Sequence, residues 1–174
     1  MNLEQMQALP HKWWKKSVRY TRCHENILID LPVKEIFIDV TFPSRSRRIN
    51  DLIALEALKL EAKVTPSRFD WFYAINTELL EWQDATSIED IEQEMADVAI
   101  FCALCLKYYF NVRVTDLMHQ RKKTKKVFVG PVYSWDVNVR LHITNLLLWA
   151  LNSPVIEKKI RFNQRRIDHG NFRH

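Results

Sequence analysis

The spacing of apolar residues predicts helices over most of this chain. From Asn50 onward, apolar side chains recur every three or four residues, which places them on one face of a helix. Residues that favour helix starts stand before these stretches, as in Thr65-Pro66 and Ser87-x-x-Asp90. The helices expected on this basis cover residues 50–63, 66–83, 88–110, 116–126, 134–151 and 154–168. The pattern therefore predicts a mainly α-helical protein.

Two short stretches have the composition of β-strands instead. Glu35–Phe42 is rich in β-branched and aromatic residues and is followed by proline, and Val127–Val129 ends at Gly130-Pro131. These stretches can pair as a two-stranded β ribbon on a helical body. Only two glycines occur in the chain, which disfavours folds with many tight turns or a glycine-rich phosphate loop. We expect an antiparallel bundle of about six helices with this ribbon attached.

The 174 residues suffice for one globular unit with a proper core. Within it we distinguish an N-terminal extension with a short strand (1–49), a helical core (50–128) and a C-terminal helical extension with a basic tail (129–174). Cys102 and Cys105 lie inside an apolar run and are predicted to be buried free thiols. No apolar run approaches the roughly 20 residues that span a bilayer, and the N-terminus lacks a signal-peptide pattern. We therefore expect a cytoplasmic protein without a membrane segment.

Four acids stand out by their spacing. Glu78 and Glu81 are followed, after twelve residues, by Glu94 and Asp97. Each pair has an i, i+3 step and so lies on one helix face, and the short connector at 84–87 makes the two helices antiparallel neighbours. Four carboxylates at similar height repel one another, and a hard cation such as Mg²⁺ is their natural ligand. The ordinary alternative is that each acid belongs to a solvated helix face.

The sequence around Glu94 and Asp97 supports a metal site more strongly than the sequence around Glu78 and Glu81. Asp97 directly precedes Val98–Leu106, which is apolar on every side, and an unpaired charge there is costly. We therefore expect Asp97 and Glu94 to contact a metal ahead of the other two acids. The same apolar stretch, together with Leu146–Leu151, offers surfaces for a subunit interface or for the core.

The chain carries a formal net charge of +5, and its basic residues are clustered. Such clusters are often solvated helix ends, but together they suit a polyanionic partner, either a triphosphate or a nucleic acid. The clusters are Lys12–Arg22, Arg45–Arg48, Arg121–Lys126 and Lys158–Arg173.

The order of acid pairs, apolar helix and basic segment over 78–128 resembles the all-α nucleoside triphosphate pyrophosphatases, which include MazG proteins, dCTP pyrophosphatases and dimeric dUTPases. The resemblance implies a MazG-like helical bundle that binds Mg²⁺, with Mn²⁺ as an alternative. It also implies hydrolysis of a (d)NTP to the monophosphate and pyrophosphate, a role in nucleotide-pool control, and assembly as a homo-oligomer, either dimer or tetramer.

The resemblance further implies roles for individual residues. The metal ligands would be Glu78, Glu81, Glu94 and Asp97, and the last three would be catalytic, with Glu81 orienting or deprotonating the attacking water. Two segments compete for phosphate binding: Lys123 in the basic helix, or Lys159, Asn163 and Arg166 near the C-terminus. The base would stack on Trp82, Trp71 or Phe72.

An alternative from another class is a helical nucleic-acid-binding or scaffold protein in which the acid pairs are incidental. The basic clusters would then form a phosphate-contacting face. Charge reversal at Arg45, Arg47 and Arg48 would weaken salt-sensitive binding to RNA or DNA. A third possibility is a relative that keeps the fold and serves only as an oligomerisation module.

Overall fold

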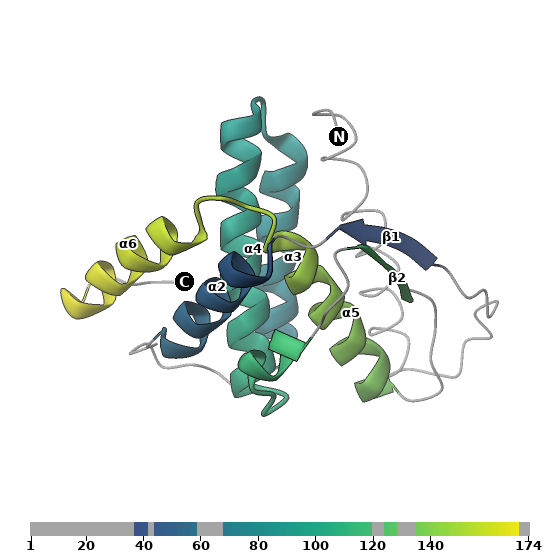
Figure 1. Cartoon of the computed structure of the whole chain (residues 1–174). Coiled ribbons are helices and arrows are strands. Elements are labelled where there is room, and N and C mark those ends of the chain that lie inside the picture. The colour runs from purple at the N-terminus through teal and green to yellow at the C-terminus, as the bar shows by residue number, and fades with distance from the viewer. Residues whose placement is uncertain (1–36, 42–43, 59–67, 120–123, 129–134, 171–174) are drawn as a thin grey trace.

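The computed structural model describes residues 37–41, 44–58, 68–119, 124–128 and 135–170, and most of these are helical (Figure 1). The prediction of a mainly α protein is confirmed. The helices are α2 (Arg45–Ala57), α3 (Arg68–Asp84), α4 (Ile88–Tyr108), α5 (Trp135–Ala150) and α6 (Ile156–Asp168), with a 3₁₀ helix η1 (Val114–His119) and strands β1 (Phe37–Thr41) and β2 (Thr124–Phe128).

Helix α4 is the centre of the fold. It packs against α3, α5, α6 and α2, and α3 lies beside it as an antiparallel neighbour (Figure 1). Because α4 has neighbours on several sides, almost all of Val98–Leu106 is buried, and Cys102 and Cys105 are buried free thiols as predicted. Leu146–Ala150 of α5 and Leu151, directly after it, are buried too. Both apolar stretches thus belong to the core of one chain, and neither is the subunit interface considered above.

The start of α4 is fixed by its own sequence. The Ser87 hydroxyl accepts a hydrogen bond from the backbone N–H of Asp90 at 3.1 Å, as the Ser-x-x-Asp spacing predicts. Glu89 and Asp90 place negative charge in the first turn, where the helix dipole favours it. At the other end, Asn111 adopts a left-handed backbone with φ of 53° soon after α4 ends. These local signals set which residues of α4 face α3.

Hydrogen bonds to two other helices hold the connection between α5 and α6. The Nη2 group of Arg47 on α2 donates to the backbone carbonyl of Asn152 at 3.1 Å, and also to that of Ser153. The buried Ser153 hydroxyl donates to the backbone carbonyl of Glu92 on α4. Helix α6 therefore begins at a fixed place beside α4, and its buried side then packs against the core through Ile156, Ile160, Asn163 and Ile167.

We expect the Arg47→Ala variant to lower the free energy of unfolding by about 1–3 kcal/mol, because carbonyl groups at the end of α5 lose a charged donor. The midpoint of thermal unfolding should fall by about 2–4 °C for each kcal/mol lost. The matched control is Arg161→Ala, whose ion pair with Glu157 is exposed and is worth at most about 1 kcal/mol. Equal losses in the two variants would contradict the anchoring role of Arg47.

One predicted helix is replaced in the structure by a 3₁₀ helix and a strand. The helix predicted over 116–126 is wrong, because η1 ends at His119 and β2 follows at Thr124. Strand β2 pairs antiparallel with β1, with Phe37 opposite Phe128 and Thr41 opposite Thr124. Its β-branched and aromatic residues suit a strand, and the distant partner strand supplies the hydrogen bonds that a helix would have made locally.

The helix predicted over 50–63 is displaced in the structure. Helix α2 begins at Arg45 and ends at Ala57, so it starts inside the region predicted as an N-terminal extension and ends before the predicted residue 63. Helices α5 and α6 lie within the ranges predicted for them. After α6, Gly170 has φ of 69°, the left-handed conformation in which glycine commonly ends a helix. Within the described ranges, no helix combines the length and apolar character needed to cross a membrane.

Candidate functional site

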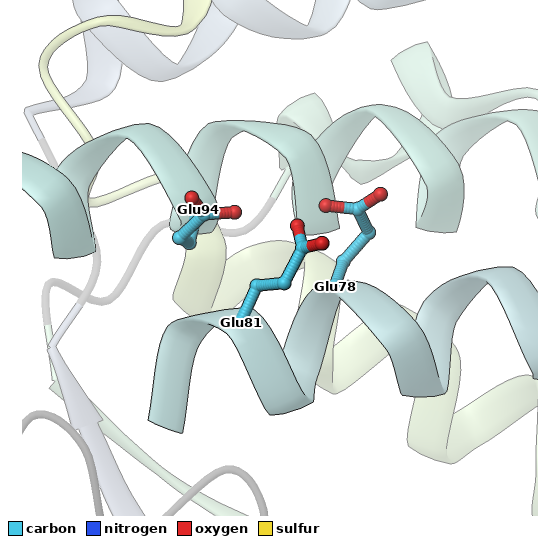
Figure 2. A group of neighbouring side chains, drawn as sticks. All are labelled: Glu78, Glu81 and Glu94. Atoms are coloured by element: carbon cyan, nitrogen blue, oxygen red, sulfur yellow. The ribbon is translucent and has the colours of Figure 1, made fainter. Parts of the chain in front are cut away.

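Three glutamates converge between α3 and α4 (Figure 2). Glu78 and Glu81 extend from α3 toward α4, and Glu94 extends from α4 to meet them. Each residue offers a carboxylate oxygen, and these oxygens lie within 4.8 Å of one another. The antiparallel α3–α4 hairpin has a turn of only three residues, 85–87, which holds the end of α3 level with the start of α4. The convergence expected from the acid spacing thus occurs for three of the four acids.

The carboxylates of the cluster repel one another. Burial raises the pKa of Glu78 to about 8, and the nearby charges of Asp97, Glu81 and Glu94 add to the effect. Burial likewise raises the pKa of Glu94 to about 7, again with help from Asp97 and Glu81, although the charge of Lys159 lowers it in part. The Oε2 atom of Glu94 is buried and finds no hydrogen-bond donor in the part of the chain that the structure describes. An added cation would relieve all three conditions.

The donor set indicates which cation fits. All three ligands are carboxylates, and oxygen-only sites select hard cations such as Mg²⁺, Mn²⁺ or Ca²⁺ over zinc or copper. The unpartnered Oε2 of Glu94 provides a ligand atom that the protein leaves unused. Glu78, Glu81 and Glu94 therefore fit a divalent cation of this class.

Asp97 is placed differently from the other three acids. Its Oδ2 atom accepts a hydrogen bond from Nζ of Lys159 on α6 at 2.9 Å, and the two side chains are only 18% and 24% exposed. Burial raises the pKa of Asp97, while the bond and charge of Lys159 lower it. We expected Asp97 and Glu94 to contact a metal ahead of the other two acids. In the structure, Glu94 groups with Glu78 and Glu81, whereas Asp97 is paired with Lys159.

Helix α6 also carries the other residues predicted to bind phosphate in the C-terminal segment. Lys159, Asn163 and Arg166 follow an i, i+4, i+7 pattern, which places them on one side of the helix. Arg166 lies close enough to Asp97 for its positive charge to lower the pKa of that acid, and Asn163 is 8% exposed. The structure thus brings two cations of this segment toward the acid cluster. The competing candidate, Lys123, lies outside the described residues.

The predicted stacking residues on α3 lie in the core. Trp82 is 2% exposed and meets the ring of Trp149 edge-on, with 6.2 Å between ring centroids. Trp71 is also buried, and the side chain of Phe72 lies outside the described part of the structure. A ring packed in this way presents no face to a nucleotide, so the burial argues against base stacking on Trp82 or Trp71. These residues line the apolar side of α3, together with Ile75 and Leu79.

Two arginines of the basic cluster on α2 have partners within the protein. Arg47 donates to carbonyl groups after α5 and lies 3.8 Å from Asp51, yet its side chain is still 38% exposed. Arg48 is 2% exposed, so it contributes little to a phosphate-contacting face. The side chain of Arg45 lies outside the described residues, and the nucleic-acid alternative stays a prediction.

The acid cluster and the adjoining side of α6 together form the candidate site. Comparisons with protein-family models, with curated proteins and with solved structures give no match. Function therefore follows from what these side chains can do. Carboxylates of α3 and α4 can hold a divalent cation, and the cations of α6 beside them can hold phosphate.

Proposed function

We propose that this chain is a metal-dependent nucleoside triphosphate pyrophosphohydrolase of the all-α, MazG-like type, which converts a (d)NTP to the monophosphate and pyrophosphate. One observation carries the proposal: three carboxylates with oxygens within 4.8 Å of one another lie next to Asp97 and its partner Lys159. A divalent cation bound to a triphosphate would meet the carboxylates, and the phosphate oxygens would meet the ammonium group of Lys159.

The acids would hold the metal ion and act on the attacking water. Glu78, Glu81 and Glu94 would be the ligands for Mg²⁺ or Mn²⁺, whose chemistry there would be to supply positive charge to the triphosphate. Glu81 is the exposed member of the three, so it has the best access to water. Its carboxylate would orient this water or accept its proton as the α–β phosphoanhydride breaks.

The cations of α6 would hold the phosphates. Lys159 and Arg166 can donate charge-assisted hydrogen bonds to the β- and γ-phosphate oxygens, and these bonds strengthen as charge builds up on the departing pyrophosphate. Asn163, predicted to share this role, lies between them in the sequence and is buried. Assembly as a dimer or tetramer stays a prediction of the resemblance.

We expect pyrophosphate and a nucleoside monophosphate in equal amounts when the protein is incubated with its preferred substrate and Mg²⁺. The measurement is a panel of all common NTPs and dNTPs, with pyrophosphate and orthophosphate quantified separately. A chelator should abolish the reaction, and Mn²⁺ should support it. Release of single phosphates, or turnover that is indifferent to a chelator, would contradict the proposal.

A further inference from the structure

The ion pair between Lys159 and Asp97 lies next to the acid cluster. Asp97 is close enough to Glu78 and Glu94 for its charge to act on both, yet its Oδ2 atom is bonded to Lys159 at 2.9 Å. The lysine comes from α6, whose start is anchored to α4 through Ser153. The pair therefore links the metal site to the helix proposed to bind phosphate.

We propose that Lys159 is an exchangeable counter-cation: it holds Asp97 while no divalent ion is bound, releases it when the ion binds, and then moves to the triphosphate. Asp97 is thereby freed to join Glu78, Glu81 and Glu94 around the ion. This inference rests on the proposed function, because it assumes that the acids hold a metal and that α6 meets phosphate.

The charges explain why the lysine would be held in one state and released in the other. A carboxylate that is 18% exposed is costly without a partner, so Asp97 needs a cation when the site holds no metal. A divalent ion among the neighbouring carboxylates supplies that charge and repels the ammonium group. Lysine carries its point charge on a flexible four-carbon stem, so it can change partners without movement of α6.

Exchange of this kind couples metal binding to nucleotide binding. Triphosphate oxygens give the released ammonium group a new anionic partner, which removes it from competition for Asp97. By linkage, whatever the nucleotide adds to metal affinity, the metal adds to nucleotide affinity. The site would therefore bind the metal–nucleotide complex better than either component alone.

The chemical reactivity of Lys159 reports its state directly in the wild-type protein. Acetylation by acetic anhydride, quantified for each lysine by mass spectrometry, should be slow at Lys159 without metal and about fivefold or more faster with Mg²⁺. A nucleoside α,β-imidotriphosphate added with Mg²⁺ should protect Lys159 again. Lys158 is the internal control, because it is exposed next to Lys159 and lines a groove with Arg161 and Arg165. Its acetylation should stay constant in all three conditions.

Metal affinity of variants gives a second measurement. Lys159→Gln should bind Mn²⁺ about tenfold more tightly than wild type without nucleotide, and Lys158→Gln, with the same change in charge, should stay near wild type. Lys159→Arg keeps the positive charge and should restore the weaker binding. Circular dichroism establishes that each variant is folded.

The outcomes separate the exchange from the proposed function. If the wild-type protein binds Mn²⁺ but the acetylation of Lys159 does not respond, or if Lys159→Gln and Lys158→Gln bind Mn²⁺ equally, the exchange is overturned while the metal site stands. If the wild-type protein binds no Mn²⁺ at all, both proposals are overturned.

Discussion

The Glu94→Gln variant should release pyrophosphate from a nucleoside triphosphate about 10²–10³-fold more slowly than the wild-type chain. Glutamine keeps the shape of the side chain but removes the negative charge, and one of its two ligand atoms becomes an amide nitrogen. The buried Oε2 atom of Glu94, which has no donor among the described residues, is the atom that a metal ion would use. The measurement is turnover at saturating Mg²⁺ and substrate.

Two controls show that this loss comes from the site. Glu89→Gln changes an exposed acid in the first turn of the same helix, outside the convergent cluster, and should keep nearly full activity. Glu94→Gln also removes repulsion from Asp97 and Glu81, so its free energy of unfolding should equal or exceed that of wild type without metal. Equal activity losses in the two variants, or full activity in Glu94→Gln, would exclude Glu94 from the catalytic machinery.

The second large effect is the dependence of stability on pH and metal. The pKa values of Glu78, about 8, and Glu94, about 7, lie above the 4.5 of an ordinary glutamate. Between the ordinary pKa and the raised pKa of each group, the folded protein binds more protons than the unfolded chain. Without metal, the free energy of unfolding therefore falls as pH rises from about 4.5 to about 8. The contribution is fully present in acid and is lost as pH passes the folded-state pKa values.

Divalent ions should reverse this trend, because they replace the protons. At a free concentration of 100 times its dissociation constant, Mg²⁺ adds about 2.7 kcal/mol, which raises the midpoint of thermal unfolding by about 5–10 °C. The increase should be larger near pH 8 than near pH 6, where protons still compete with the ion. Differential scanning calorimetry at several pH values, with and without Mg²⁺, measures both effects.

A variant isolates the contribution of the cluster. Burial also raises the pKa of Asp51 to about 6, and this residue adds a decline of the same sign at lower pH. Glu78→Gln should therefore remove most of the decline between about pH 7 and 8, while Glu94 and Asp51 still lower the free energy of unfolding over their own intervals at lower pH. A metal-free midpoint that stays flat over this interval in wild type would contradict the raised pKa values.

Most of the helices could be predicted because their signals are local. The Ser87 cap and the apolar run behind Asp97 both act within a few residues, and they located α4 closely. The whole of strand β2 could not be found in the same way. Val127 and Phe128 have strand-like side chains, but Thr124–Lys126 continue a helix-like stretch, and only pairing with the distant β1 makes them part of the strand.

The same contrast between local signals and distant contacts applies to the candidate site. An i, i+3 step and a short turn suffice to bring Glu78, Glu81 and Glu94 together, so their meeting was predictable from spacing. The partner of Asp97 depends on where α6 lies. That position is decided by hydrogen bonds between residues far apart in the sequence, from Arg47 to Asn152 and from Ser153 to Glu92. The spacing of residues on α3 also could not say whether Trp82 faces the core or the site.

Hydrolysis in water labelled with a heavy oxygen isotope shows which phosphorus atom of the nucleoside triphosphate is attacked. Attack on the α-phosphorus places the labelled oxygen in the nucleoside monophosphate and leaves the pyrophosphate unlabelled, and mass spectrometry of the two products distinguishes these positions. We predict one labelled oxygen in the monophosphate, formed only when Mg²⁺ or Mn²⁺ is present. Label in the pyrophosphate or in orthophosphate, or no hydrolysis of any nucleoside triphosphate with these ions, would contradict it.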